Sequence, residues 1–175
     1  SPPRRGNKNK LFARKIYARM WEMNFRDKVL TPDQLKHWRD NLRKAGKKLV
    51  VTNGCFDLLH VGHVSYLENA RKLGDALLVG VTGDSGVRKI KGEGRPINSE
   101  TDRAAVLAAL QMVDAVHVFP ETTALRFLTD VAPDIYVKGG DYTLETINQE
   151  ERRLVESVGG KVEILPGVAG KSTTS

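Results

Sequence analysis

From residue 48 onward, short apolar runs alternate with segments of helical periodicity. The runs that predict strands cover residues 48–52, 76–82, 115–119, 134–137 and 161–165. They lack the strict alternation of half-exposed strands, and continuous apolar strands are buried on both faces, as in parallel sheets. The segments that predict helices between them cover residues 63–73, 99–112, 122–131 and 148–158. The pattern predicts an α/β fold, a doubly wound sheet of five parallel strands in the order 3-2-1-4-5.

The N-terminal part of the chain has a different character. Residues 1–30 are interpreted as a basic extension, either a plain extension or a targeting peptide, in which residues 11–28 carry a stripe typical of a helix. Residues 31–175 are predicted to form one domain. Thr31 is expected to cap its first helix, with Gln34 as the capping-box partner, and the helix to end near Lys44.

The net charge is +7, and the excess of basic residues lies wholly in residues 1–48. Residues 1–48 contain 15 Lys and Arg against 4 Asp and Glu, whereas residues 49–175 contain 13 against 17. The body of the chain therefore offers no broad basic face, and we do not expect it to bind nucleic acid. Cys55 is the single cysteine, which excludes an intrachain disulfide, and no apolar run has the length of a membrane span. We expect a cytoplasmic protein that does not associate with membranes.

The residues after the first predicted strand form the most specific pattern in the chain. His60 and His63 bracket Gly62 at the point where a helix is expected to begin. Ligands bind beyond the carboxyl ends of the strands in an open parallel sheet, and the N–H groups of a helix start favour anions. Two imidazoles that converge there can donate hydrogen bonds to phosphate oxygens. We predict a phosphate-handling site, and the missing Lys-Ser/Thr ending excludes a P-loop.

Polar residues after the second strand add to this site. Lys89 and Lys91 are predicted to lie in a loop, from which a flexible lysine can reach phosphate groups. Arg95 can clamp a phosphate through two hydrogen bonds. Asp57 and Asp84 can bind substrate hydroxyls or help to hold Mg²⁺ around the phosphates.

The run TNGCFDLLHVGH resembles the signature of the HxGH nucleotidyltransferase superfamily, in its cytidylyltransferase-like branch. Within this superfamily the chain is most similar to the heptose 1-phosphate adenylyltransferases, the ADP-heptose synthases. The supporting stretches are HVSYLENARKLGD (63–75), KIKGEGRPIN (89–98), DRAAVLAAL (102–110), DIYVKGGDY (134–142) and KSTT (171–174). The resemblance covers residues 31–175 and implies a Rossmann-like domain, here with an N-terminal helical extension.

The residue pattern and the family resemblance together predict that His60, His63 and Lys91 are catalytic. Between Lys89 and Lys91, it is the resemblance that selects Lys91. The resemblance also implies that Arg103 faces the phosphates and that the loop after the fourth strand lies near the base and ribose. The residues predicted to bind the nucleotide are Asn53, Gly54, Cys55, Phe56, Gly62, Arg103, Lys138, Gly139, Gly140, Asp141, Ser172, Thr173 and Thr174. Those predicted to bind the second substrate are Asp57, Asp84 and Arg95.

The predicted reaction is transfer of AMP from ATP to heptose 1-phosphate, with pyrophosphate leaving in line and no covalent intermediate. Mg²⁺ is expected with ATP, and no side chain is assigned as its direct ligand. Gly167 stands where cytidylyltransferases carry an arginine, which favours ATP over CTP. The family's last helix is expected to be cut short at Ser175. We also expect a homodimer.

Two alternatives stay open. The first is a cytidylyltransferase of the same superfamily that acts on an alcohol phosphate such as glycerol 3-phosphate. The second is a non-catalytic module that binds a nucleotide, or that binds nucleic acid through its basic N-terminal segment.

Overall fold

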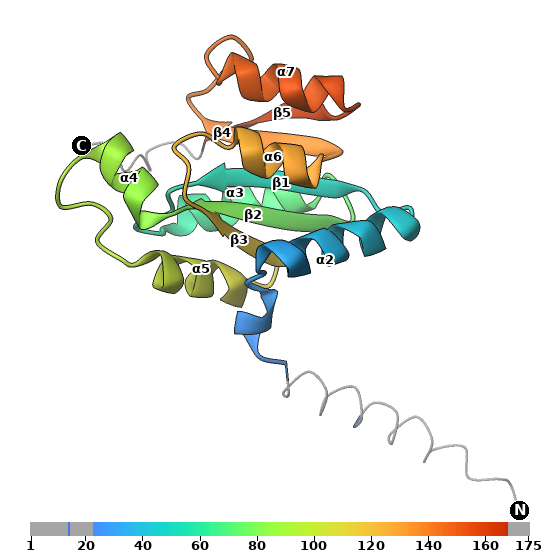
Figure 1. Cartoon of the computed structure of the whole chain (residues 1–175), viewed down its shortest axis with the longest axis horizontal. Coiled ribbons are helices and arrows are strands. Elements are labelled where there is room, and N and C mark those ends of the chain that lie inside the picture. The colour runs from blue at the N-terminus through green and yellow to red at the C-terminus, as the bar shows by residue number, and fades with distance from the viewer. Residues whose placement is uncertain (1–13, 15–22, 168–175) are drawn as a thin grey trace, which may run out of the picture.

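The computed structural model describes residue 14 and residues 23–167, which include a single five-stranded parallel sheet. The strands lie in the order β3-β2-β1-β4-β5, so the predicted fold class and strand order are confirmed (Figure 1). Their bounds are β1 Leu49–Gly54, β2 Ala76–Thr82, β3 Ala115–Phe119, β4 Ile135–Gly140 and β5 Lys161–Pro166.

Helices cover both faces of the sheet. One face carries α2 (Pro32–Lys44), α6 (Leu125–Val131) and α7 (Gln149–Ser157), and the other carries α3 (Val61–Arg71) and α5 (Glu100–Ala109). Besides these, the 3-10 helix η1 (Phe25–Lys28) packs near α5, and α4 (Asp84–Lys91) follows β2. None of the described helices is long and apolar enough to cross a membrane.

Side chains that follow one another along a strand enter opposite layers of the core. Val50 and Leu77 pack with α3 and α5, whereas Val51 and Leu78 pack with α2, α6 and α7. All four side chains are completely buried. Because both faces are covered, both sets of positions must be apolar, which explains the continuous apolar runs in the sequence.

The start of the domain forms as predicted. Thr31 Oγ1 accepts a hydrogen bond from the Gln34 N–H, and Gln34 Oε1 accepts one from the Thr31 N–H, which completes the capping box of α2. Residues assigned to the N-terminal extension also contact the domain, since Leu30 N–H donates to the Val116 carbonyl and Lys28 Nζ to that of Val113, both at 2.8 Å. Most of the helix predicted over 11–28 lies outside the described residues.

Two strands run further than predicted. β1 continues through Gly54, which pairs with Val81, and β4 continues through Gly140, which pairs with Pro166. Lys138 is therefore part of β4 and does not follow it. Backbone pairing needs no apolar side chain, so the end of an apolar run underestimates the length of a strand.

The loop predicted around Lys89 and Lys91 is wrong, because both residues lie in the last turn of α4. Gly86 lowers the helix propensity of this segment, but it lets the helix approach β2 closely. A Cβ atom at this position would lie 2.7 Å from the Thr82 side chain. The Glu100 carboxylate also accepts a hydrogen bond from the first N–H of α4, at Asp84. Tertiary packing here outweighs local propensity.

Candidate active site

The start of α3 is built by its two histidines. His60 is the N-cap residue, and its Nδ1 accepts a hydrogen bond from the Gly62 N–H at 3.0 Å. His63 lies in the first turn, and its Nδ1 accepts from the His60 N–H at 3.3 Å. The two ring centroids are 4.1 Å apart. The pair therefore forms a reciprocal cap that holds both rings together at the helix start.

These hydrogen bonds determine which ring nitrogen carries the proton. Because each Nδ1 accepts from a backbone N–H, the neutral form of each ring has its hydrogen on Nε2. Burial lowers the pKa of His63, and the neighbouring charges of His60 and Lys91 lower it further. His63 is therefore a neutral Nε2–H donor at neutral pH, beside a helix N-terminus that attracts anions.

The lowered pKa of His63 makes the stability of the protein depend on pH. The unfolded chain, in which His63 titrates near 6.5, binds a proton more readily than the folded chain, so stability rises with pH in this range. The contribution is complete above the unfolded value and is lost as the pH falls below it. We expect the free energy of unfolding by urea to decrease between about pH 7.5 and about pH 5.5. The same pH dependence in the His63→Gln variant would contradict this assignment.

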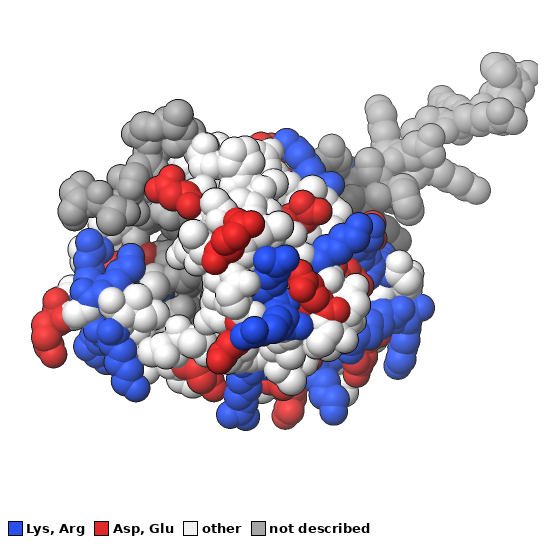
Figure 2. All heavy atoms as spheres, turned by 90° about the horizontal axis from the view of Figure 1, so that it is seen from above, with Lys and Arg blue, Asp and Glu red and all other residues white. Residues whose placement is uncertain are grey.

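Lys91, the third predicted catalytic residue, lies near this pair. It is exposed at the end of α4, close enough for its charge to lower the pKa of His63. Arg88 and Lys89 lie in the same helical turn. Figure 2 shows Lys and Arg side chains gathered at the end of the molecule where α4 lies, while acidic and basic side chains are interspersed elsewhere on that face. The charge of Lys91 therefore acts on His63, one of the two predicted catalytic histidines.

Phe56 packs against His63 of the histidine pair. Its backbone has a positive φ of 47°, which turns the chain sharply after β1. The buried ring lies edge-on to His63, with centroids 5.9 Å apart, and packs over Gly54, where a Cβ atom would lie 3.1 Å from it. Gly54 and Phe56, both predicted to bind the nucleotide, help to set the position of His63.

Two residues predicted to bind the second substrate pair with each other. Asp57 accepts from Arg95 Nη1 at 2.7 Å and from the N–H groups of Ile97 and Asn98 at 2.8 and 3.1 Å. Burial opposes ionisation of Asp57, but the hydrogen bonds from Arg95, Asn98 and Ile97 outweigh it and hold its pKa below the ordinary value. Asp57 therefore ties the loop before α5 to the end of β1, while the Arg95 side chain stays 36% exposed.

Arg103 and Asp84 also form a pair. Arg103 Nη2 lies 2.7 Å from Asp84 Oδ1, and Arg103 Nη1 donates to the carbonyls of Cys55 and Thr82. Arg103 Nε donates to the Asn98 carbonyl at 3.0 Å. The side chain of Arg103 is only 1% exposed. Arg103 thereby joins the carboxyl ends of β1 and β2 to the loop that Asp57 holds.

The far side of the site is formed by the end of β4. Lys138 Nζ donates to Asn53 Oδ1 at 2.7 Å, which joins β4 to β1. Gly139 lies against the ring of Tyr66 from α3, and a Cβ atom at this position would clash with that ring. The Tyr66 hydroxyl donates to the Val137 carbonyl and contacts Thr52 Oγ1, so the ring cannot easily move. The glycine is required by Tyr66, a residue whose contribution to the site was not predicted.

The remaining predicted residues are less informative. Asp141 is exposed after β4, and Ser172, Thr173 and Thr174 lie outside the described residues.

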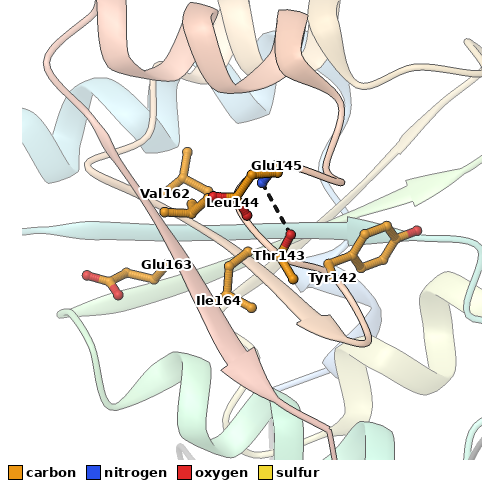
Figure 3. A pocket seen from close by; sticks show the side chains of 7 residues that line it. All are labelled: Tyr142, Thr143, Leu144, Glu145, Val162, Glu163 and Ile164. Atoms are coloured by element: carbon orange, nitrogen blue, oxygen red, sulfur yellow. Dashed lines mark hydrogen bonds between the residues drawn. The ribbon is translucent and has the colours of Figure 1, made fainter.

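An open hollow of about 380 Å³ lies between the loop after β4 and the outer strand β5, lined by the residues labelled in Figure 3. The Tyr142 ring lines it and also lies 5.9 Å from Lys138 Nζ, so the hollow adjoins the β4 side of the site.

The described residues contain no group of three or more His, Cys, Asp or Glu that could hold a metal ion. Asp57 and Asp84 each face an arginine. Mg²⁺ commonly binds through substrate phosphates and one or two carboxylates, so these residues suit an ion that arrives with the nucleotide better than a resident ion.

The residues of this candidate site lie within a stretch of the chain that matches a known protein family. The model of the cytidylyltransferase-like family matches residues 51–172. The chain belongs to the cytidylyltransferase-like family of nucleotidyltransferases. This match spans the histidine pair, Lys91, Arg103 and the end of β4, so the assembled site coincides with the family's domain.

Relatives of this nucleotidyltransferase include two proteins named bifunctional protein HldE. The one from Syntrophotalea carbinolica is 48% identical over 153 residues, which are 87% of this chain and 31% of the relative. The one from Geotalea uraniireducens is 55% identical over 130 residues, which are 74% of this chain and 26% of the relative. The chain thus spans about a third or less of the length of these relatives.

Two solved structures are similar to this nucleotidyltransferase. The lipopolysaccharide core biosynthesis protein from Thermoplasma volcanium is 32% identical, with a TM-score of 0.58 over 70% of this chain and 98% of that protein. The pantoate-β-alanine ligase from Francisella tularensis is 17% identical, with a TM-score of 0.59 over 78% and 65%, and shares the fold.

Proposed function

We propose that this nucleotidyltransferase transfers AMP from ATP to heptose 1-phosphate and releases pyrophosphate. The observation that carries the proposal is the pair of Nε2–H donors of His60 and His63 beside the start of α3. The choice of acceptor is supported by the similarity to proteins named bifunctional protein HldE and to a lipopolysaccharide core biosynthesis protein. The choice of ATP over CTP is supported by Gly167, which replaces the arginine typical of cytidylyltransferases.

In this mechanism, an oxygen of the sugar 1-phosphate attacks the α-phosphorus of ATP in line with the pyrophosphate leaving group. His60 and His63 donate hydrogen bonds to phosphate oxygens, and these bonds strengthen as negative charge grows in the transition state. Lys91, exposed at the end of α4, adds a positive charge beside them. No side chain forms a covalent bond with the substrate, so catalysis rests on positioning and charge stabilisation.

Mg²⁺ would enter with the triphosphate and neutralise part of its charge. Asp84 is the carboxylate best placed to approach such an ion, because its side chain is 30% exposed whereas that of Asp57 is 2% exposed. Arg103 orients Asp84 through a hydrogen bond of 2.7 Å.

A panel of nucleotides and acceptors tests the proposal through the rate of pyrophosphate release. We expect ATP with heptose 1-phosphate to be the best combination, because the similarity to proteins named bifunctional protein HldE supports this acceptor and Gly167 supports ATP over CTP. Preference for CTP with glycerol 3-phosphate would instead support a cytidylyltransferase. A non-catalytic module would instead release no pyrophosphate with any combination. It would also bind nucleic acid in a salt-dependent way, and this binding would be lost when residues 1–28 are removed.

A further inference from the structure

A buried polar cluster joins residues of β1, β4 and α7. The Tyr136 hydroxyl is 2.6 Å from Asn53 Oδ1 and 2.9 Å from Glu151 Oε2, and its single proton can be donated to either. Lys138 Nζ is 2.7 Å from Asn53 Oδ1 and 3.9 Å from Glu151 Oε2. The second carboxylate oxygen, Glu151 Oε1, accepts from the Ala124 N–H at 2.8 Å. Glu151 on α7 thus contacts Tyr136 and Lys138 of β4, and these two side chains in turn contact Asn53 of β1.

The burial of this cluster is unusual for charged residues. Glu151 is 4% exposed, Tyr136 is completely buried, and the Lys138 side chain is 15% exposed. A buried carboxylate is costly unless it is hydrogen-bonded and paired with a positive charge. Glu151 accepts hydrogen bonds from Ala124 and Tyr136 and lies beside the ammonium group of Lys138. Burial lowers the pKa of Lys138, whereas the charge of Glu151 opposes that change and favours the ammonium form.

The cluster leaves Asn53 with one orientation. Lys138 Nζ donates to Asn53 Oδ1, and the Tyr136 hydroxyl donates to the same oxygen when its proton is not directed to Glu151. The carboxamide oxygen is therefore occupied, and only the N–H groups remain to be offered to a ligand. Asn53 is half-buried near the carboxyl end of β1. Since β2 and β4 flank β1, the strand order reverses at this point, and ligands bind at such a reversal in open α/β sheets.

We propose that Glu151 is a positioning residue, which acts through Tyr136 and Lys138 to aim the Asn53 carboxamide N–H at an acceptor atom of the bound nucleoside. This inference rests on the proposed function, because it assigns a contact to the nucleotide of that reaction. Glu151 itself does not touch the nucleotide. In the proposed function the reacting phosphates bind at the start of α3, away from this cluster. We therefore expect the cluster to act on nucleotide affinity and to leave the chemical step unchanged.

The Tyr136→Phe variant separates this role from folding. It keeps the ring in the core but removes the hydroxyl that lies between Glu151 Oε2 and Asn53 Oδ1. We expect the dissociation constant for ATP to rise about three- to tenfold, as for one lost hydrogen bond, with kcat within about twofold of wild type. Glu151→Leu is expected to weaken binding similarly, whereas Glu151→Gln, which can still accept from Ala124 and donate to Tyr136, should bind nearly as wild type. The exposed neighbour provides a matched control in Glu150→Leu.

The decisive comparison repeats Tyr136→Phe in an Asn53→Ala background and measures ATP binding by calorimetry. If the cluster acts through Asn53, Tyr136→Phe has no further effect there, because coupled residues are not additive. Equal losses in both backgrounds, or unchanged affinity in Tyr136→Phe, would overturn the inference while leaving the proposed function intact. A wild-type protein that binds no ATP would overturn both.

Discussion

Replacing His60 with asparagine is expected to lower kcat for pyrophosphate release by about 10²- to 10³-fold, the usual cost of one lost donor to a charged transition state. Asparagine is among the best N-cap residues, so its oxygen can replace His60 Nδ1 in accepting from the Gly62 N–H. The side chain is too short to supply the outward Nε2–H donor. The variant therefore separates the two roles of His60, the cap and the phosphate contact.

Two further measurements show whether His60→Asn removes only the phosphate contact. The melting temperature of His60→Asn should stay close to that of wild type, since the cap is retained. His37→Asn is the matched control, because His37 is exposed on α2 and should keep full activity. A His60→Asn enzyme as active as wild type would show that the histidine serves only to cap α3.

The second large effect concerns stability. We expect Arg103→Met to lower the free energy of unfolding by about 3–5 kcal/mol, the range for breaking a buried charged pair from one side. Loss of the guanidinium leaves the carbonyls of Thr82, Cys55 and Asn98 without their donor and removes the partner of Asp84. The carboxyl ends of β1 and β2 would then be joined less firmly to the loop before α5.

Urea unfolding followed by circular dichroism measures this loss. Arg88→Met is the control, because Arg88 is exposed on α4 and its replacement should change stability by less than about 0.5 kcal/mol. A loss for Arg103→Met no larger than for the control would mean that Arg103 does not hold these strands together.

The fold and the histidine pair could be predicted because their signals are local. Strands buried on both faces leave continuous apolar runs, and Thr31, Ser99 and Gly62 mark helix starts within a few residues. The capping role of the histidines was harder to predict, because His60 replaces the usual Ser, Thr, Asp or Asn at this position.

The partners of the other site residues could not be predicted. Asp57 and Arg95 are 38 positions apart in the chain, and Asn53 and Tyr136 are 83 apart. Such pairs form only when the sheet brings its strand ends together, and nothing local distinguishes Glu151 from the acidic residues around it. The tyrosine hydroxyl within the apolar strand β4 was the one available signal, since a buried hydroxyl requires a partner.

The most direct test of nucleotidyl transfer at the histidine pair follows the fate of ATP labelled at its α-phosphorus, with heptose 1-phosphate as acceptor. Wild type should transfer the label to a nucleotide sugar and release one pyrophosphate for each label transferred, and His60→Asn should do so about 10²- to 10³-fold more slowly. Label that stays in ATP, or that is released as free AMP without a labelled sugar product, would contradict the account.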